Sequence, residues 1–252
     1  MKKVLFVIAG VVALVGLPTF FILKAPSSHE SAPESLSLKE ALGQTLIIGF
    51  EGREMNVELE DLIKKIQPGG VLLLGRNIKD AEQTKKLIAD LQSISSIPLF
   101  VAVDQEGGIV SRVPWGEVTS QTALKTEEEA LRVGKERGEF LQELGINMNL
   151  APVLDSNLPG DHLFSRSFQR DSEVSSAFAF AIIQGHEQQE VLAVPKHYPG
   201  YDGISFNPEA KIIPHTRGFP RAEVFSHLFS RTSISRFMIF LFFISFWTSF
   251  FF

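Results

Sequence analysis

The chain has 252 residues, of which 44% are hydrophobic and 21% charged, and its formal net charge is −5. This is the balance of a globular protein with enough chain for one sizeable core. The absence of cysteine excludes disulfides, thiolate metal sites and a cysteine nucleophile. The chain has no basic stripe and no H-E-x-x-H motif among its six histidines, so we expect no nucleic-acid partner, no metal and no other cofactor.

The first 24 residues have the pattern of a membrane-targeting segment. Lys2 and Lys3 precede an uncharged, mostly apolar run over 4–23, which as a helix is just long enough to cross a bilayer core of about 30 Å. A signal anchor and a cleaved signal peptide both fit this pattern, and the length of the run favours the anchor. The remaining chain is then expected on the exported face of the membrane, or secreted if the segment is cleaved. Residues 25–34, rich in Ser and Pro, are expected to form a linker.

From residue 35 onward, helical and strand patterns alternate. Helices are predicted over 38–46, 58–66, 80–94, 126–144 and 172–188, and short apolar strands over 46–50, 71–74, 99–103, 147–154 and 191–194. Short strands that alternate with amphipathic helices predict βαβ units and a parallel sheet. Strands that are apolar on both faces predict a sheet that is buried on both sides. The predicted fold class is therefore α/β.

Polar residues follow four of these strands. They are Gly75-Arg76-Asn77, Asp104-Gln105-Glu106, Asp155-Ser156-Asn157 and Lys196-His197. Recurrent polar strand ends favour a (β/α)8 barrel, whose functional residues lie at the carboxyl ends of its strands, and no G-x-G-x-x-G or Walker A motif supports a nucleotide-binding sheet. A complete barrel takes about 250 residues. We therefore expect an incomplete barrel over 35–218, with about five of the eight units.

The segment 101–112 holds the most informative group of polar residues. An apolar strand runs into Asp104 and Glu106, and a pair of glycines separates these acids from Arg112. Carboxylates and a guanidinium at a strand end suit a polar ligand, and glycines let the backbone turn tightly and approach that ligand. The alternative is a turn with two solvated acids and a surface arginine.

Five segments, in order along the chain, carry a family resemblance. They are Pro68-Gly69-Gly70-Val71, Asp104-Gln105-Glu106-Gly107-Gly108 with Arg112, Asn149–Asp155, Arg166-Ser167-Phe168 and Lys196-His197-Tyr198-Pro199-Gly200. Together they resemble the amino-terminal barrel domain of glycoside hydrolase family 3, and most closely its bacterial β-N-acetylhexosaminidases. The resemblance implies an amino-sugar glycan as substrate and hydrolysis of terminal β-linked N-acetylglucosamine from cell-wall-type glycans.

The same resemblance implies the roles of individual residues. Asp104 accepts hydrogen bonds from sugar hydroxyls, and four cationic or imidazole groups donate to ring substituents: Arg112, Arg166, Lys196 and His197. Structural alternatives stay open for some of these positions. Glu106 and Asp155 either belong to the site or fix loops, and Arg166 either binds the ligand or forms a surface ion pair.

The chain departs from the family at the residues of catalysis. A retaining glycosidase needs a nucleophilic carboxylate and an acid/base that flank the scissile bond. The resembling enzymes carry the nucleophile as an Asp on a later strand, and no segment here matches it. Their Asp-x-His acid/base dyad would fall at Asn207 and Glu209, so Glu209 is the candidate acid/base, with a solvated loop acid as the alternative. This form of the chain is therefore expected to be inactive.

The composition changes after about residue 217. Half of the 22 phenylalanines lie in 219–252, and 237–252 carries no charge. A frameshift or a truncated gene explains such an aberrant tail, and a second membrane segment is the alternative, although 16 residues are short for a span. Two alternatives to an active hydrolase follow. One is a poorly folded, non-catalytic product, and the other is a membrane-tethered glycan-binding module that keeps the pocket without the chemistry.

Overall fold

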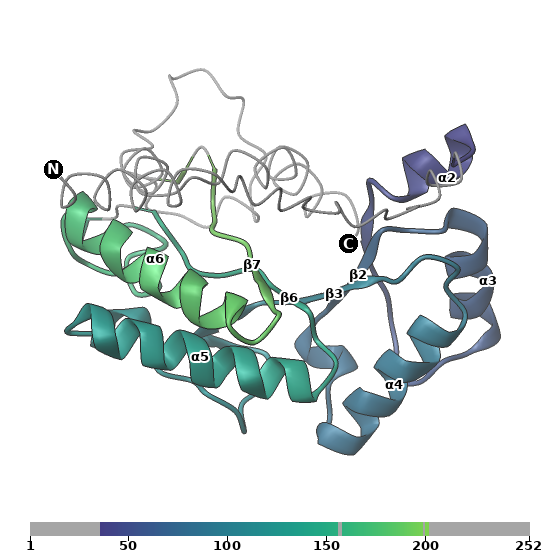
Figure 1. Ribbon diagram of the computed structural model, residues 1–252, viewed down its shortest axis with the longest axis horizontal. Helices are drawn as coiled ribbons and strands as arrows, with labels where there is room; N and C mark the ends of the chain where they lie inside the picture. The colour runs from purple at the N-terminus through teal and green to yellow at the C-terminus, as the bar shows by residue number, and fades with distance from the viewer. Residues whose placement is uncertain (1–35, 156–157, 199, 202–252) are drawn as a thin grey trace, which may run out of the picture. The chain divides into compact units, whose positions relative to one another are not determined.

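The computed structural model describes residues 36–155, 158–198 and 200–201. Their centre is a five-stranded parallel sheet with the order β1-β2-β3-β6-β7 (Figure 1). The strands are β1 (Ile47–Gly49), β2 (Gly70–Leu73), β3 (Phe100–Val103), β6 (Met148–Asn149) and β7 (Leu192–Ala193). Every pair of neighbouring strands is joined through at least one helix, as parallel pairing requires. The predicted α/β class with a parallel sheet is confirmed.

In the described part of the chain, five α-helices connect these strands or precede them. They are α2 (Leu38–Gly43), α3 (Val57–Ile66), α4 (Ala81–Ser93), α5 (Glu127–Glu143) and α6 (Ser172–Glu187), and short 3₁₀ turns cover Gly75–Asn77 and Gln121–Ala123. Each α-helix begins directly after a side chain that accepts a backbone N–H of the first turn: Ser37, Asn56, Asp80, Thr126 and Asp171. These caps explain why the predicted and observed helix starts agree within about two residues.

The central strand β3 is buried on both faces along Val101–Val103. Val101 and Val103 of β3 lie in one cluster with Leu91 of α4 and Leu141 of α5, and α4 and α5 lie below the row of strands in Figure 1. Ala102, between the two valines, belongs to a second cluster, on the opposite face of the sheet. Alternate side chains of one strand therefore face two different apolar layers, as the sequence predicts.

Helices α5 and α6 pack side by side with almost no space between their backbones (Figure 1). A Cβ atom at Gly134 of α5 would lie 2.8 Å from the Cα of Ile182, and one at Gly185 of α6 would lie 2.6 Å from the carbonyl carbon of Gly134. The two glycines therefore allow this close approach. Because α6 leads into β7, the contact also fixes where the residues after β7 emerge.

Two local predictions need correction. The strand predicted over 147–154 is continuous only at Met148–Asn149, and a single parallel bridge at Val153 follows, since the chain turns in between through Pro152, which has no backbone N–H to donate. The segment after β3 is more than a turn: it forms an antiparallel hairpin of β4 (Gln105–Gly107) and β5 (Val110–Ser111). Gly107 and Gly108 make its bend with φ of +89° and +63°.

Several sequence predictions fall outside the described residues. These are the segments 1–24 and 25–34, the candidate acid/base Glu209, and the Phe-rich tail 219–252. Within the described ranges, the helices are too short or too polar to span a membrane.

Candidate functional site

The polar residues that follow three neighbouring strands lie together at one edge of the sheet. Asp104 follows β3, Asp155 follows the segment after β6, and Lys196 and His197 follow β7. A bridge between Val153 and Lys196 extends the β6–β7 pairing up to these residues. Parallel strands end at the same edge of the sheet, so side chains that are 92 residues apart in the sequence come into contact there.

Lys196 lies at the centre of this group. Its Nζ is 2.5 Å from Asp104 Oδ1 and 2.5 Å from Glu106 Oε1. All three side chains are mostly buried, with exposed fractions of 15% for Lys196, 17% for Asp104 and 2% for Glu106. Of the three N–H donors of the ammonium group, one donates to Asp104 Oδ1, and Glu106 adds an ion pair.

Asp104 remains an anion in this setting. Burial raises the pKa of its carboxyl group, but the charges of Lys196, Arg112 and Arg166 outweigh burial, so that the pKa lies below its ordinary value. Only Oδ1 accepts a hydrogen bond from the described residues. Within the described ranges, Oδ2 is thus a charged acceptor to which no donor is assigned.

Glu106 and Arg166 form a two-point ion pair. Arg166 donates from Nε to Glu106 Oε2 at 2.9 Å and from Nη2 to Oε1 at 2.7 Å. Burial lowers the pKa of Arg166, and the Glu106 carboxylate more than offsets this, so the pKa is raised overall. Because Glu106 is buried, this contact is not a loose surface ion pair, and such paired hydrogen bonds fix the guanidinium plane. Glu106 thus acts as the anchor of two cations.

Asp155 orients His197. Its Oδ2 lies 2.7 Å from His197 Nδ1 and also accepts the backbone N–H of His197, while Oδ1 accepts the backbone N–H of Tyr201. An acceptor on Nδ1 requires the proton there, which leaves Nε2 as the acceptor of the neutral ring. No hydrogen bond within the described part of the chain reaches Nε2. Asp155 therefore does both things that the sequence left open: it serves the site and it fixes the loop.

Arg112 completes the group. Its charge acts on Asp104, and its Nε is buried without a hydrogen-bond partner among the described residues. Leaving a buried donor unpaired costs about 1–3 kcal/mol. Together with Asp104 Oδ2 and the Lys196 ammonium group, it gives the site a mixed set of charged donors and acceptors, which suits a ligand rich in hydroxyl groups.

Three further residues support the site from beneath, and sequence reasoning assigned no role to two of them. Asn149 holds both backbone polar groups of Gln105, with its Oδ1 and Nδ2 each 3.0 Å from its partner. Arg137 of α5 donates to the backbone carbonyl of Glu106 and to the carboxylate of Glu117. Arg137 and Glu117 stand among many charged residues of 117–143. Their spacing carries no signal that would distinguish them from solvated side chains.

The comparisons with known proteins agree with this arrangement. The family model described as the glycosyl hydrolase family 3 N terminal domain matches residues 37–216. The chain belongs to glycoside hydrolase family 3. The resemblance inferred from the five sequence segments is therefore confirmed, and all the residues of the candidate site lie inside the matched range.

Curated relatives in this family are named beta-hexosaminidases. Beta-hexosaminidase A of Pseudoalteromonas piscicida is 30% identical over 230 residues, which cover 78% of this chain and 37% of the relative. The beta-hexosaminidase of Photobacterium profundum is 29% identical over 165 residues, which cover 63% of this chain and 49% of the relative. The chain thus spans half or less of the length of these family 3 relatives.

Solved structures of the family share the fold. A glycoside hydrolase family 3 β-N-acetylglucosaminidase from Paenibacillus sp. superposes with a TM-score of 0.70 at 32% identity, over 79% of this chain and 41% of that one. A β-N-acetylhexosaminidase from Beutenbergia cavernae superposes with a TM-score of 0.66 at 27% identity, over 76% of this chain and 63% of that one. The parallel α/β arrangement is therefore that of the family 3 N-terminal barrel domain.

Proposed function

We propose that this domain binds the terminal N-acetylglucosamine unit of cell-wall-type glycans, as the sugar-binding part of a β-N-acetylhexosaminidase. The observation that carries the proposal is the cluster around Lys196, in which Asp104 Oδ2 and the buried Nε of Arg112 have no hydrogen-bond partner among the described residues. Family membership and the names of the relatives support the substrate class.

The chemistry of the pocket fits a sugar. Each hydroxyl of a hexosamine can both donate and accept a hydrogen bond. Asp104 Oδ2 would accept from one hydroxyl, and Lys196 and Arg112 would donate to others. Hydrogen bonds to charged groups contribute about 1.5–3 kcal/mol each, so two or three of them suffice for specific recognition of a small ligand.

The described carboxylates do not form a catalytic pair. Both oxygens of Glu106 are held by Arg166, and both oxygens of Asp155 accept hydrogen bonds from the loop after β7. Asp104 alone keeps an oxygen free, and one carboxylate cannot be nucleophile and acid/base at once. We therefore propose that Asp104 binds sugar hydroxyls rather than acting as nucleophile, that Glu209 is the acid/base without a nucleophilic partner among the described residues, and that the chain binds the sugar without hydrolysing it at a normal rate.

Two parallel measurements test this proposal. Calorimetric titration with N-acetylglucosamine measures binding, and release of nitrophenol from a chromogenic N-acetyl-β-glucosaminide measures hydrolysis. Asp104→Ala should abolish binding, whereas Asp61→Ala, at an exposed position of α3, should leave it unchanged. Equal affinity of the wild type and Asp104→Ala would refute the assigned pocket. Hydrolysis at a normal rate would refute only the claim of inactivity.

The second candidate function is a membrane-tethered glycan-binding module. One observation favours it: the carboxylates of Glu106 and Asp155 are paired with Arg166 and His197 and are therefore not free for catalysis. In this proposal residues 1–24 act as the anchor and the domain faces the exported side of the membrane. Protease accessibility of the domain in intact cells, and its recovery with the membrane fraction, test this placement. Recovery of the domain in the cytoplasm would contradict it.

A further inference from the structure

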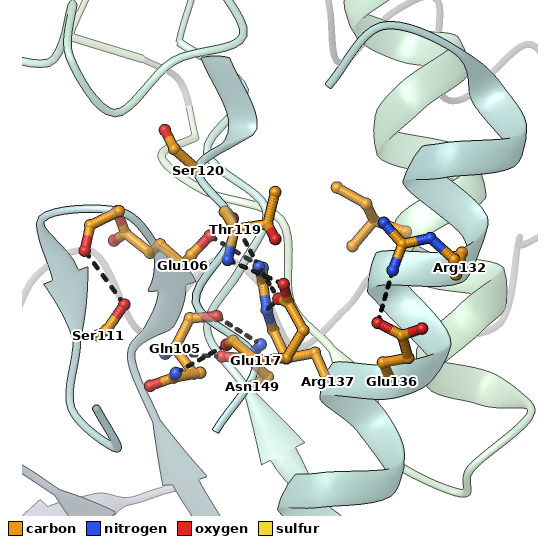
Figure 2. A network of polar contacts seen from close by, with 12 residues as sticks. Gln105, Glu106, Ser111, Glu117, Thr119, Ser120, Arg132, Glu136, Arg137 and Asn149 are labelled. Carbon is orange, nitrogen blue, oxygen red and sulfur yellow. Dashed lines mark hydrogen bonds and ion pairs between the residues drawn. The ribbon is translucent and has the colours of Figure 1, made fainter. Parts of the chain in front are cut away.

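Arg137 is a charged side chain that is almost completely enclosed. It lies on α5 with an exposed fraction of 1%, and its guanidinium points toward the β4–β5 hairpin (Figure 2). Nη1 donates to the backbone carbonyl of Glu106 at 2.8 Å, and Nη2 donates to the backbone carbonyl of Thr119 at 2.8 Å. Nε and Nη2 both donate to Glu117 Oε2, at 2.9 and 2.5 Å. One side chain therefore joins three separate points of the chain.

The surroundings of Arg137 are built for this contact. The other oxygen of Glu117 accepts the backbone N–H of Thr119 at 2.8 Å, so the partner carboxylate is itself held in place. A Cβ atom at Gly107, the residue after Glu106, would lie 2.8 Å from Arg137 Nη2. Because Gly107 has no side chain, the guanidinium can reach the Glu106 carbonyl.

Glu106 stands between two anchors. Asn149 of β6 holds the backbone of Gln105 on one side, and Arg137 holds the Glu106 carbonyl itself. The Glu106 side chain in turn contacts Arg166 and Lys196. The backbone position of Glu106 thus decides where these two cations lie relative to Asp104.

We propose that Arg137 is a positioning residue of the sugar site, which fixes the backbone of Glu106 and thereby aligns Arg166 and Lys196 with the ligand. Stability alone is a poor explanation of the Arg137–Glu117 pair, because apolar residues of similar volume often replace buried ion pairs without loss of stability. The inference rests on the proposed sugar-binding function, and it adds a residue from outside the pocket to that function.

Paired replacement separates positioning from stability. In Arg137→Met with Glu117→Leu, both charges are removed together, so that neither remains buried without a partner. The matched control is Arg132→Met with Glu136→Leu, an exposed Arg–Glu pair on the same helix with a 2.7 Å contact (Figure 2). Arg137→Lys is the conservative variant, which keeps the charge but lacks the planar fork that reaches several acceptors at once.

Two readouts in the full chain decide the question. Calorimetry with N-acetylglucosamine should show at least tenfold weaker binding in the Arg137–Glu117 variant, a smaller loss in Arg137→Lys, and no change in the control. Hydrogen exchange at the backbone of 105–107 should be faster in the Arg137–Glu117 variant than in the control at matched melting temperature. The exchange measurement needs no ligand, so it tests the positioning of Glu106 even if sugar binding fails.

The outcomes are distinct. A wild type that does not bind the sugar overturns the proposed function, whereas a wild type and an Arg137–Glu117 variant that bind equally overturn the role of Arg137. If the paired variant does not fold, Arg137→Lys takes its place in both measurements. Unchanged exchange and unchanged affinity in the variant that folds would refute the inference.

Discussion

Replacing Lys196 by methionine removes a positive charge that lies 2.5 Å from two poorly exposed carboxylates. Breaking a buried ion pair costs about 3–5 kcal/mol. Because Arg166 still holds Glu106 in the variant, we expect about 3 kcal/mol, the lower end of that range. The matched change Lys64→Met breaks an exposed pair with Glu60 on α3 and should cost less than about 1 kcal/mol.

The loss should depend on pH in a defined direction. In the wild type, burial raises the pKa of Asp104. The positive charges of Lys196, Arg112 and Arg166 lower it by more, so the pKa lies below its ordinary value. This lowered pKa contributes stability that is present at neutral pH and lost as the pH falls through the folded-state pKa. Without Lys196, burial raises the pKa, and Asp104 becomes neutral at a higher pH. The stability difference between wild type and variant should therefore shrink toward acid pH.

Urea unfolding at pH 7 and at pH 4.5 measures this difference directly. We expect the Lys196→Met deficit to be about 3 kcal/mol at pH 7 and smaller at pH 4.5, because Asp104 becomes neutral at a higher pH in the variant than in the wild type. The Lys64→Met deficit should stay small at both pH values. A Lys196→Met deficit that is the same at pH 7 and pH 4.5 would refute the reasoning about Asp104.

Three further predictions follow from other parts of the domain. Burial lowers the pKa of His186 to about 4, so the free energy of unfolding should fall by about 3 kcal/mol as the pH drops from about 6.5 to about 4. Urea unfolding of His186→Gln, which lacks the titrating group, should depend less on pH than that of the wild type. The same pH dependence in both proteins would contradict the assignment. Gly134→Ala should destabilise the domain by about 1–3 kcal/mol through overpacking against α6, measured by thermal unfolding, with Gly49→Ala, where a Cβ meets nothing within 4 Å, as the control. Asp155→Asn should weaken sugar binding at least tenfold, as measured by calorimetry, because His197 loses its charged acceptor; unchanged affinity would remove His197 from the site.

Much of the fold could be predicted from local signals. Asp80 and Thr126 mark helix starts that the structure shows as side-chain caps, and the apolar run before Asp104 predicts β3. These features depend on residues that are close in sequence. The strand predicted over 147–154 is longer than β6, because apolar composition does not reveal where the pairing between strands stops. The hairpin β4–β5 is not predicted, because its two glycines fit a hairpin and a simple tight turn equally well.

The site could be predicted only in part. The acids and cations at the strand ends were expected to meet, since parallel strands end at one edge of the sheet. Which acid holds which cation depends on long-range contacts, such as Glu106 with Arg166, 60 residues later. Arg137 could not be recognised at all, since burial turns an ordinary helix arginine into a positioning group, and burial is a property of the fold.

The central claim is that the pocket around Lys196 holds an N-acetylglucosamine unit. A crystal structure of the chain in complex with N-acetylglucosamine tests it most directly. Our account predicts sugar hydroxyls within hydrogen-bond distance of Asp104 Oδ2 and Lys196 Nζ, with Arg112 Nε paired to the ligand. A sugar bound elsewhere, or an empty Lys196 pocket at saturating sugar concentration, would contradict it.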